Sequence, residues 1–254
     1  MHNYKKKFGQ HFLHDKNIIQ KIILKLQPKH HDYFIEIGPG EGALTNPLIE
    51  KTSKITLIEK DKDLIQLLKN RYEKYKSIQI IHNDILKCNL NEYVCERTRI
   101  IGNLPYNIST EIIFKILSIS SNVKDIHFML QKEVVDRMIA DPGSKTYGRL
   151  SVMTQVYFEV KKLFDISPNV FIPKPKVISS YVKMIPKVSC FKNAKKEINF
   201  RKLVTTVFTA RRKMIKTSLK GFIDVSVLES LKINPNSRPE DLKIKDYLDI
   251  AEYV

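Results

Sequence analysis

The sequence predicts an α/β protein with a mostly parallel sheet, followed by a small all-α domain. Three observations lead to this fold class. Short apolar runs alternate with amphipathic stretches through the first half of the chain. Two later apolar runs follow one another without a long helix between them. After about residue 187, the remaining patterns have helical spacing. Strands that alternate with helices in this way form βαβ units and a doubly wound sheet.

Five apolar runs predict the parallel strands, and the stretches between them predict the covering helices. Asp61–Lys74 and Ser109–Leu117 each place aliphatic side chains on one helical face. A further helix is expected at Ala43–Lys51, soon after the first of these strands. The expected strands are Tyr33–Ile37, Ile55–Ile58, Ile78–Ile81, Ile100–Ile101 and Ile126–Leu130.

The later runs, Lys161–Ile166 and Val177–Met184, predict an antiparallel pair that closes one edge of the sheet. The pattern then changes near Lys187. Asn199–Ala210 carries apolar residues at the i, i+3, i+4, i+7 and i+8 positions of a helix. We therefore expect a sheet domain over residues 1–186 and a helical domain over 187–254.

The positive charge of the chain is concentrated at its two ends. The formal net charge is +17. Residues 1–30 carry seven Lys and one Asp, and residues 187–254 carry fifteen Lys and Arg against eight Asp and Glu. The ends thus hold +6 and +7 of the total. Such a surface favours a polyanionic partner, because neutralising phosphates releases their counterions.

The composition favours a cytoplasmic protein that does not enter a membrane. No apolar run approaches the roughly 18 residues of a membrane-spanning helix. The basic N-terminus lacks the apolar segment of a secretory signal. Three scattered cysteines agree with a reducing compartment. No pattern demands more than a monomer.

A glycine-rich motif, Glu36-Ile-Gly-Pro-Gly-Glu-Gly42, directly follows the first of the five strands. Glycines there allow a sharp turn and a close approach of the backbone to a ligand. A dinucleotide site would need its third glycine one residue later, and a phosphate-binding loop would need Lys and Ser or Thr after the last one. The motif alone indicates a nucleotide or cofactor site.

Carboxylates close the next two strands. Glu59 lies 21 residues after Gly38, at the end of the second strand, where a carboxylate can accept both ribose hydroxyls of a nucleoside. Asp84 closes the third strand within Asn83-Asp-Ile-Leu86. Its carboxylate can accept a hydrogen bond from an adenine amine.

The tetrapeptide Asn103-Leu-Pro-Tyr106 closes the fourth strand and is the most specific motif of the chain. Adenine's exocyclic amine is a poor nucleophile because its lone pair is delocalised into the ring. The Asn103 side-chain oxygen and a carbonyl of Leu104 or Pro105 can grip its N–H groups and favour a pyramidal nitrogen. Pro105 fixes the turn, and Tyr106 offers a face on which a flipped base can stack.

Taken together, these motifs resemble those of the ribosomal RNA adenine dimethyltransferases. The opening segment Phe8-Gly-Gln-His-Phe-Leu-His-Asp15, Phe171-Ile-Pro173 and Arg211-Arg-Lys213 are also similar to that family, and the resemblance covers essentially the whole chain. The string Asn103–Thr110 is most similar to the small-subunit branch, the kasugamycin-sensitivity methyltransferases.

The resemblance implies a Rossmann-like class I methyltransferase fold with S-adenosylmethionine as methyl donor. It implies dimethylation of two adjacent adenosines in a hairpin loop near the 3′ end of small-subunit (16S) rRNA, in the 30S particle, and a role in ribosome biogenesis. Phe171 would be a second stacking face opposite Tyr106. The matching cofactor-contact positions are His11, Leu13, Gly38, Glu59, Asp84 and Asn103, and the matching target-base positions are Asn103, Pro105, Tyr106 and Phe171.

The basic segment 211–220 is expected to contact the RNA backbone. Its cations are Arg211, Arg212, Lys213, Lys216 and Lys220. No metal site is expected, because the histidines have no metal-like partner spacing. Two alternatives stay open: a large-subunit rRNA adenine methyltransferase of the antibiotic-resistance type, and a non-catalytic ribosome-assembly or nucleic-acid-binding factor on the same fold.

Overall fold

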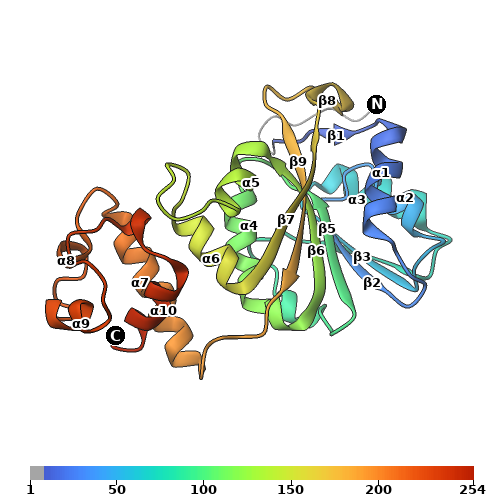
Figure 1. Cartoon of the computed structure of the whole chain (residues 1–254). Coiled ribbons are helices and arrows are strands. Elements are labelled where there is room, and N and C mark those ends of the chain that lie inside the picture. The colour runs from blue at the N-terminus through green and yellow to red at the C-terminus, as the bar shows by residue number, and fades with distance from the viewer. Residues whose placement is uncertain (1–8) are drawn as a thin grey trace. The chain divides into compact units, whose positions relative to one another are not determined.

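The computed structural model describes residues 9–254, so Phe8 of the opening motif lies outside the described residues. The chain forms two compact units (Figure 1). The first contains the residues up to Val135 and the segment Glu159–Pro186. The second contains Asp136–Phe158 and Lys187–Val254.

The first unit is built on a seven-stranded sheet with the order β4-β3-β2-β5-β6-β9-β7. Strands β2 to β6 are parallel, and β9 pairs antiparallel with β6. The sequence-based fold class is therefore confirmed. The strands are β2 (Tyr33–Ile37), β3 (Lys54–Glu59), β4 (Ile78–His82), β5 (Thr98–Asn103), β6 (Val123–Gln131), β7 (Phe158–Ile166) and β9 (Ser179–Pro186).

Both late apolar runs become strands at the expected edge of this sheet, with β9 inserted between β6 and the edge strand β7. A separate two-stranded sheet joins β1 (Phe12–Leu13) to β8 (Phe171–Ile172) in antiparallel register. This small sheet ties the N-terminal segment to the loop before β9.

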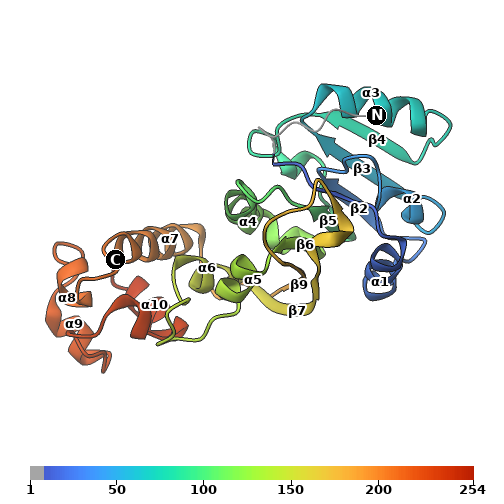
Figure 2. The same ribbon diagram turned by 90° about the horizontal axis from the view of Figure 1, so that it is seen from above.

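Helices cover both faces of the large sheet. In Figure 2, α4 (Ser109–Ile116) lies on the opposite side of the sheet from α1 (Lys16–Leu26) and α2 (Thr45–Leu48). The central strands β2 and β5 are buried at nearly every position because helices cover both faces of the sheet. The core on one face joins residues of α1, the α2 segment and α3 (Lys62–Tyr72) to Phe34 and Leu57 of the sheet.

The helix expected at Ala43–Lys51 is much shorter than predicted. Only Thr45–Leu48 is α-helical. Pro47 lies inside the segment and has no backbone N–H to donate to the preceding turn. The chain continues through turns into β3.

The second unit is helical, but it contains more of the chain than the segment 187–254. Residues 136–158, with α6 (Arg149–Tyr157), also belong to it. Gly143 N donates to Glu240 O (2.7 Å), and the Tyr147 ring contacts Phe208 with centroids 6.3 Å apart. The predicted boundary at 186/187 is thus only one of the places where the chain passes between units. Apart from short 3₁₀ turns, the other helices of the second unit are α7 (Ala194–Thr209), α8 (Ile215–Ser218), α9 (Val225–Ser230) and α10 (Ile244–Ala251). Helix α5 (Lys132–Met138) begins in the first unit and ends in the second.

The apolar side chains of α6 explain why the sequence did not reveal this division. Leu150 and Val152 lie on nearly opposite sides of the helix and are both buried, as are Ser151 and Thr154. A helix without one apolar stripe gives no periodic indication of the element against which it packs.

Among residues 9–254, no helix combines the length and the apolar character needed to cross a bilayer.

Candidate active site

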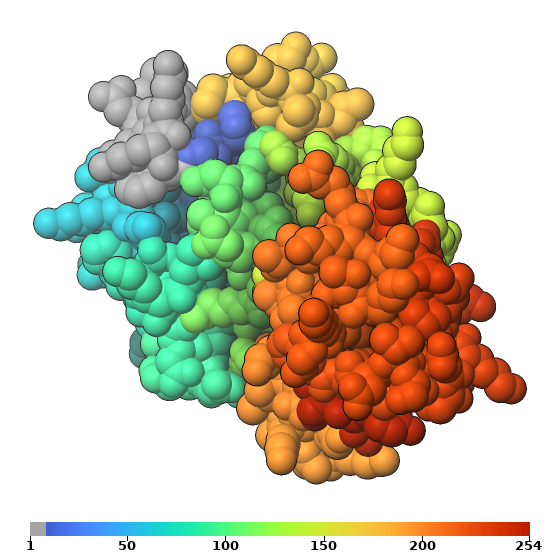
Figure 3. Space-filling model, turned by 90° about the vertical axis from the view of Figure 1, so that its left-hand side faces the viewer, coloured from blue at the N-terminus to red at the C-terminus, as the bar shows by residue number. Residues whose placement is uncertain are grey.

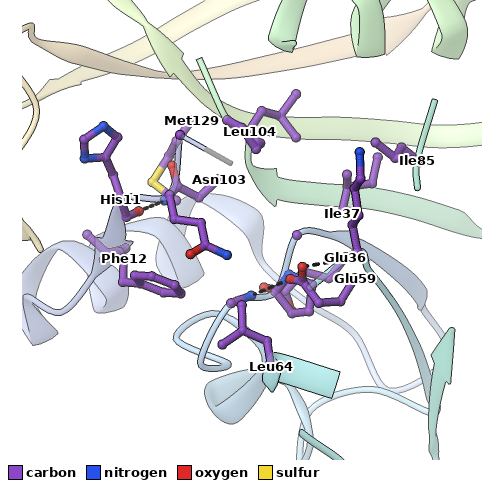
Figure 4. A pocket seen from close by; sticks show the side chains of 18 of the residues that line it. His11, Phe12, Glu36, Ile37, Glu59, Leu64, Ile85, Asn103, Leu104 and Met129 are labelled. Carbon is purple, nitrogen blue, oxygen red and sulfur yellow. Dashed lines mark hydrogen bonds between the residues drawn. The ribbon is translucent and has the colours of Figure 1, made fainter. Parts of the chain in front are cut away.

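A pocket lies at the carboxyl ends of the parallel strands in the first unit (Figure 4). This edge of an open α/β sheet is the usual place for a ligand. The pocket gathers eight of the predicted cofactor and target-base residues: His11, Leu13, Gly38, Glu59, Asp84, Asn103, Pro105 and Tyr106.

The glycine-rich loop lets the N-terminal segment cross closely above it. Gly38, Gly40 and Gly42 all have positive φ, at 65°, 58° and 85°. A Cβ atom on Gly40 would lie 2.8 Å from the Phe12 ring, so only glycine fits there without a shift. The loop and the segment 9–14, which we call the N-terminal strap, thus form two walls of the pocket.

Glu59 at the end of β3 has one carboxylate oxygen engaged and the other nearly free. Oε1 accepts hydrogen bonds from the backbone N–H groups of Lys60 and Asp61, both at 2.8 Å. Oε2 has a weak contact with Gly40 N at 3.4 Å. Burial raises the pKa of Glu59, although these N–H groups partly oppose the shift. A buried acceptor oxygen with spare capacity fits the ribose hydroxyls of S-adenosylmethionine.

Asp84 lies in the pocket as a carboxylate. Its Oδ2 accepts from Lys60 Nζ at 2.7 Å, and its Oδ1 accepts from Leu86 N at 3.0 Å. Burial alone would raise its pKa, but these hydrogen bonds outweigh that effect and hold the pKa below its usual value. An ionised acceptor at this place fits an adenine amine.

The side-chain amide of Asn103 connects the end of β5 to the strap. Its Nδ2 donates to the main-chain carbonyl of His11 at 2.6 Å, a bond visible in Figure 4. A carbonyl oxygen only accepts, so the amide nitrogen must face His11. The Oδ1 atom is therefore available as an acceptor.

The hydroxyl of Tyr106 is hydrogen-bonded, and Tyr106 lines the pocket. The Tyr106 hydroxyl and Ser179 Oγ are hydrogen-bonded at 2.6 Å. Burial raises the pKa of Tyr106, so the phenol stays neutral. In the turn before it, Pro105 O accepts from Ile108 N at 3.3 Å. That bond makes the Leu104 carbonyl the freer of the two candidate acceptors.

Phe171 does not line the pocket in this structure, and its assignment as the second stacking face stays a prediction. It is 2% exposed and belongs to the core cluster around α1 and the sheet. In β8, successive side chains point to opposite sides. Phe171 therefore enters the core, while its neighbour Ile172 is 43% exposed and lines the pocket.

Glu36 is a pocket residue to which the sequence interpretation gave no role. It lies at the end of β2 and is buried beside the glycine-rich loop. Thr45 Oγ1 donates to its Oε2 at 2.6 Å. Burial, assisted by the charge of Glu59, raises its pKa to about 7 despite the Thr45 hydrogen bond. Its place as the first residue of the glycine motif was the available indication.

In the helical unit, the structure separates Arg211 from the other basic residues. Arg211 Nε lies 3.2 Å from Glu240 Oε2, and its Nη2 donates to Lys145 O at 2.8 Å. Arg211 therefore joins the loop 141–148 to the 3₁₀ turn Pro239–Asp241. The exposed cations of the segment are Arg212, Lys213, Lys216 and Lys220. We call these four the basic cluster.

Buried Ile215 and Leu219 anchor α8, which holds Lys216 of the basic cluster at the surface. Figure 3 shows a face of the molecule on which atoms coloured orange to red, the colours of the helical unit's C-terminal part, lie at the surface. In the part of the chain that the structure describes, no three His, Cys, Asp or Glu side chains gather as metal ligands.

Comparisons with known proteins place the whole chain in one family. The family model described as ribosomal RNA adenine dimethylase matches residues 1–254. The Ribosomal RNA small subunit methyltransferase A of Marinobacter nauticus is 42% identical over 254 residues, covering 100% of this chain and 92% of that protein.

Solved structures agree. A dimethyladenosine transferase from Plasmodium falciparum superposes with a TM-score of 0.81 at 28% identity, over 94% of this chain and 96% of that one. The 23S rRNA methyltransferase ErmE shares the fold, with a TM-score of 0.73 at 22% identity over 95% and 98% of the two chains. The family model spans every residue of the chain, and the Marinobacter nauticus protein is 42% identical over all of it. The chain therefore belongs to the ribosomal RNA adenine dimethylase family.

Proposed function

We propose that this protein transfers methyl groups from S-adenosylmethionine to the exocyclic amines of two adjacent adenosines in a hairpin loop near the 3′ end of small-subunit rRNA, in the 30S particle. The observation that carries the proposal is the convergence of Glu59, Asp84 and the tetrapeptide 103–106 in one pocket. The small-subunit name of the 42% identical relative supports this choice of substrate.

The pocket residues divide between cofactor and base. Glu59 Oε2 would accept the ribose hydroxyls, Asp84 would accept the adenine amine of the cofactor, and the glycine-rich loop would lie against it. Leu13 and the main chain of His11 would close the cofactor from above. When bound, the cofactor supplies a methyl group that its sulfonium already activates for transfer.

On the base side, Asn103 Oδ1 and the Leu104 carbonyl would accept the two N–H groups of the target amine. This geometry holds the lone pair toward the methyl group, so positioning supplies much of the rate. Tyr106 would stack on the flipped base. The surplus proton becomes acidic after methyl transfer and can leave to water, so the reaction needs no dedicated general base.

The basic cluster would contact the phosphate backbone of the RNA. The arginine and lysine side chains of this cluster are exposed, and α8 carries part of it at the surface. Arg211 is better assigned to holding the helical unit together, since its guanidinium already meets Glu240 and a backbone carbonyl. We further propose that the protein acts as a monomer in the cytoplasm, with a role in ribosome biogenesis.

The first test is methyl transfer from labelled S-adenosylmethionine to small subunits that lack these methyl groups. Normal small subunits and undermethylated large subunits serve as controls. Dimethyladenosine that appears only in the deficient small subunits is the expected result. Label in large subunits would instead favour an antibiotic-resistance type of enzyme. No transfer despite cofactor binding would favour an assembly factor.

Asn103→Ala tests the assignment of the base site. It removes the Oδ1 acceptor, and we expect kcat on deficient small subunits to fall by about 100-fold or more. Unchanged methylation would contradict the role given to Asn103. Calorimetric titration with S-adenosylmethionine shows whether the variant keeps a folded pocket.

A further inference from the structure

The groups assigned to the target base are two acceptors and a stacking ring, and none of them donates to the ring of the base. Asn103 Oδ1 and the Leu104 carbonyl would accept the N–H groups of the amine, and Tyr106 would stack. Cytosine and guanine also carry an exocyclic amine, so these contacts alone do not select adenine. The adenine ring nitrogens nearest to the amine, N1 and N7, are both acceptors. A side-chain N–H donor beside the amine site would therefore add recognition of adenine.

Asn107 stands in the right place for such a donor. It directly follows Tyr106, lines the same pocket and is exposed. On one side of it, Ile108 N donates to Pro105 O at 3.3 Å. Ser109 Oγ donates to Tyr106 O at 3.2 Å. These bonds hold the main chain around Asn107, so its side chain starts from a fixed point next to the stacking ring.

The side-chain amide of Asn107 has no hydrogen-bond partner among residues 9–254. Gly9 of the N-terminal strap lies beside it, and a Cβ atom on Gly9 would be 3.0 Å from Asn107 Oδ1. Gly9 also has a positive φ of 60°, which favours glycine. The strap thus passes close to the Oδ1 atom, while both N–H donors of Nδ2 stay unused within the described part of the chain.

Two other donors of the pocket, both on the strap, are already engaged. Gln10 Nε2 donates to Asp61 Oδ2 at 3.2 Å. The Nδ1 atom of His11 lies 2.6 Å from Pro173 O. Because a carbonyl oxygen only accepts, that nitrogen carries the proton and donates. Asn107 therefore offers an unused amide donor directly beside the stacking ring.

We propose that Asn107 Nδ2 donates a hydrogen bond to a ring nitrogen of the target adenine, N1 or N7, and so contributes to the selection of adenine. This inference rests on the proposed function, because it adds a base-reading contact to that site. The amine would be bound by Asn103 and Leu104, and the ring would be read by Asn107. Since the amide is exposed, it can rotate to meet the base without disturbing the core.

Adenosine analogues test which atom is read. Methyl-deficient small subunits are reconstituted with rRNA that carries adenosine, 1-deazaadenosine or 7-deazaadenosine at one target position. Mass spectrometry of the nucleosides measures methylation there. Each analogue keeps the amine and lacks one ring nitrogen. We expect the wild type to lose about tenfold in kcat/KM on one of the two analogues, which corresponds to about 1.4 kcal/mol for one hydrogen bond.

Two variants of Asn107 separate this contact from the intrinsic reactivity of each analogue, which is the same for every protein. Asn107→Ala should lose about tenfold in kcat/KM on adenosine and nothing further on the analogue against which the wild type discriminates. Asn107→Asp keeps the size of the side chain but only accepts, so it should lose at least as much. The Kd for S-adenosylmethionine, measured by calorimetry, should stay unchanged in both variants. Asn122→Ala, at an exposed position outside the pocket, should match the wild type throughout.

The preference for adenosine over each analogue decides the outcome. The same preference in the wild type and in Asn107→Ala, for both analogues, would overturn the proposal. An Asn107→Asp protein as active as the wild type on adenosine would also overturn it. Either result, with adenosine methylated normally by the wild type, would leave the proposed function intact. No methyl transfer by the wild type to adenosine in the deficient small subunits would instead remove the proposed function, and this inference with it.

Discussion

Glu59 and Glu36 are two buried carboxyl groups in one pocket, and their partners give them different chemistry. Glu59 accepts backbone N–H groups that stabilise its charge, although burial still raises its pKa. Glu36 accepts a hydrogen bond from the hydroxyl of Thr45, and the negative charge of Glu59 nearby disfavours its ionisation. At neutral pH a large fraction of Glu36 is protonated, because its pKa is raised to about 7.

Glu59→Gln is expected to weaken binding of S-adenosylmethionine by about 10- to 100-fold, since it replaces hydrogen bonds to a charged acceptor. In the wild type the affinity should also fall as the pH is lowered, because binding needs the carboxylate. The raised pKa of Glu59 moves this loss to a higher pH than for an ordinary glutamate. Calorimetry across the acidic range measures both effects.

The matched control is Glu50→Gln, which neutralises an exposed carboxylate outside the pocket. It should leave the Kd unchanged. If Glu59→Gln bound the cofactor as tightly as Glu50→Gln at every pH, the ribose assignment would be wrong.

Glu36→Gln is expected to change how stability depends on pH. The folded state raises the pKa of Glu36 from 4.5 to about 7 and so binds its proton more tightly than the unfolded chain does. The wild-type free energy of unfolding should therefore lose up to about 3 kcal/mol as the pH rises through that window. The glutamine variant lacks this loss and should be the more stable protein above neutral pH. Urea denaturation of both proteins at several pH values measures the difference, and parallel curves would contradict it.

At the scale of elements, a buried ion network joins α1 to the strands. Arg99 of β5 donates to both carboxylate oxygens of Asp125 in β6, at 2.7 and 2.9 Å. It also donates to Asp32 before β2 and to the carbonyl of Leu26 at the end of α1. The guanidinium of Arg99 thus binds carboxylates near the starts of β6 and β2 and a carbonyl at the end of α1, and its planar set of donors suits this arrangement.

Arg99→Met should lower the free energy of unfolding by about 3–5 kcal/mol, because it leaves Asp125 and the Leu26 carbonyl without this donor inside the protein. The control is Lys124→Met. Lys124 also pairs with Asp32, at 2.8 Å, but its side chain is 42% exposed. Its loss should cost about 1 kcal/mol or less. Equal losses in the two variants would show that the network does not depend on Arg99, and chemical denaturation of both provides the comparison.

At the scale of the whole molecule, the pocket and the basic cluster lie in different units of the chain. The pocket lies within the first unit, whereas the basic cluster belongs to the helical unit. Exposed cations attract phosphates by long-range electrostatics, and salt screens this attraction. Phosphate contacts of this kind contribute to affinity, but they do not distinguish one base from another. Under the proposed function, selection of the base would belong to the pocket.

The double substitution Arg212→Ala with Lys216→Ala should reduce the salt dependence of RNA binding. Each lost phosphate contact lowers the slope of log K against log salt by about 1, so a decrease of about 2 is expected. The cofactor Kd should not change. Lys76→Ala removes an exposed cation of the first unit and serves as the control. The same slope in the double variant and the control would place the RNA contact elsewhere.

The sequence by itself determined the parallel strands, the late edge pair and eight pocket residues. Those strands are buried on both faces, so their apolar runs stand out, and parallel strands bring their carboxyl ends to one edge of the sheet. Only the tertiary structure decided what depends on contacts between distant segments. It placed Phe171 in the core, His11 on Tyr106, Arg211 against Glu240, and residues 136–158 in the helical unit. These contacts have no periodicity along the chain, because each joins residues that folding alone brings together.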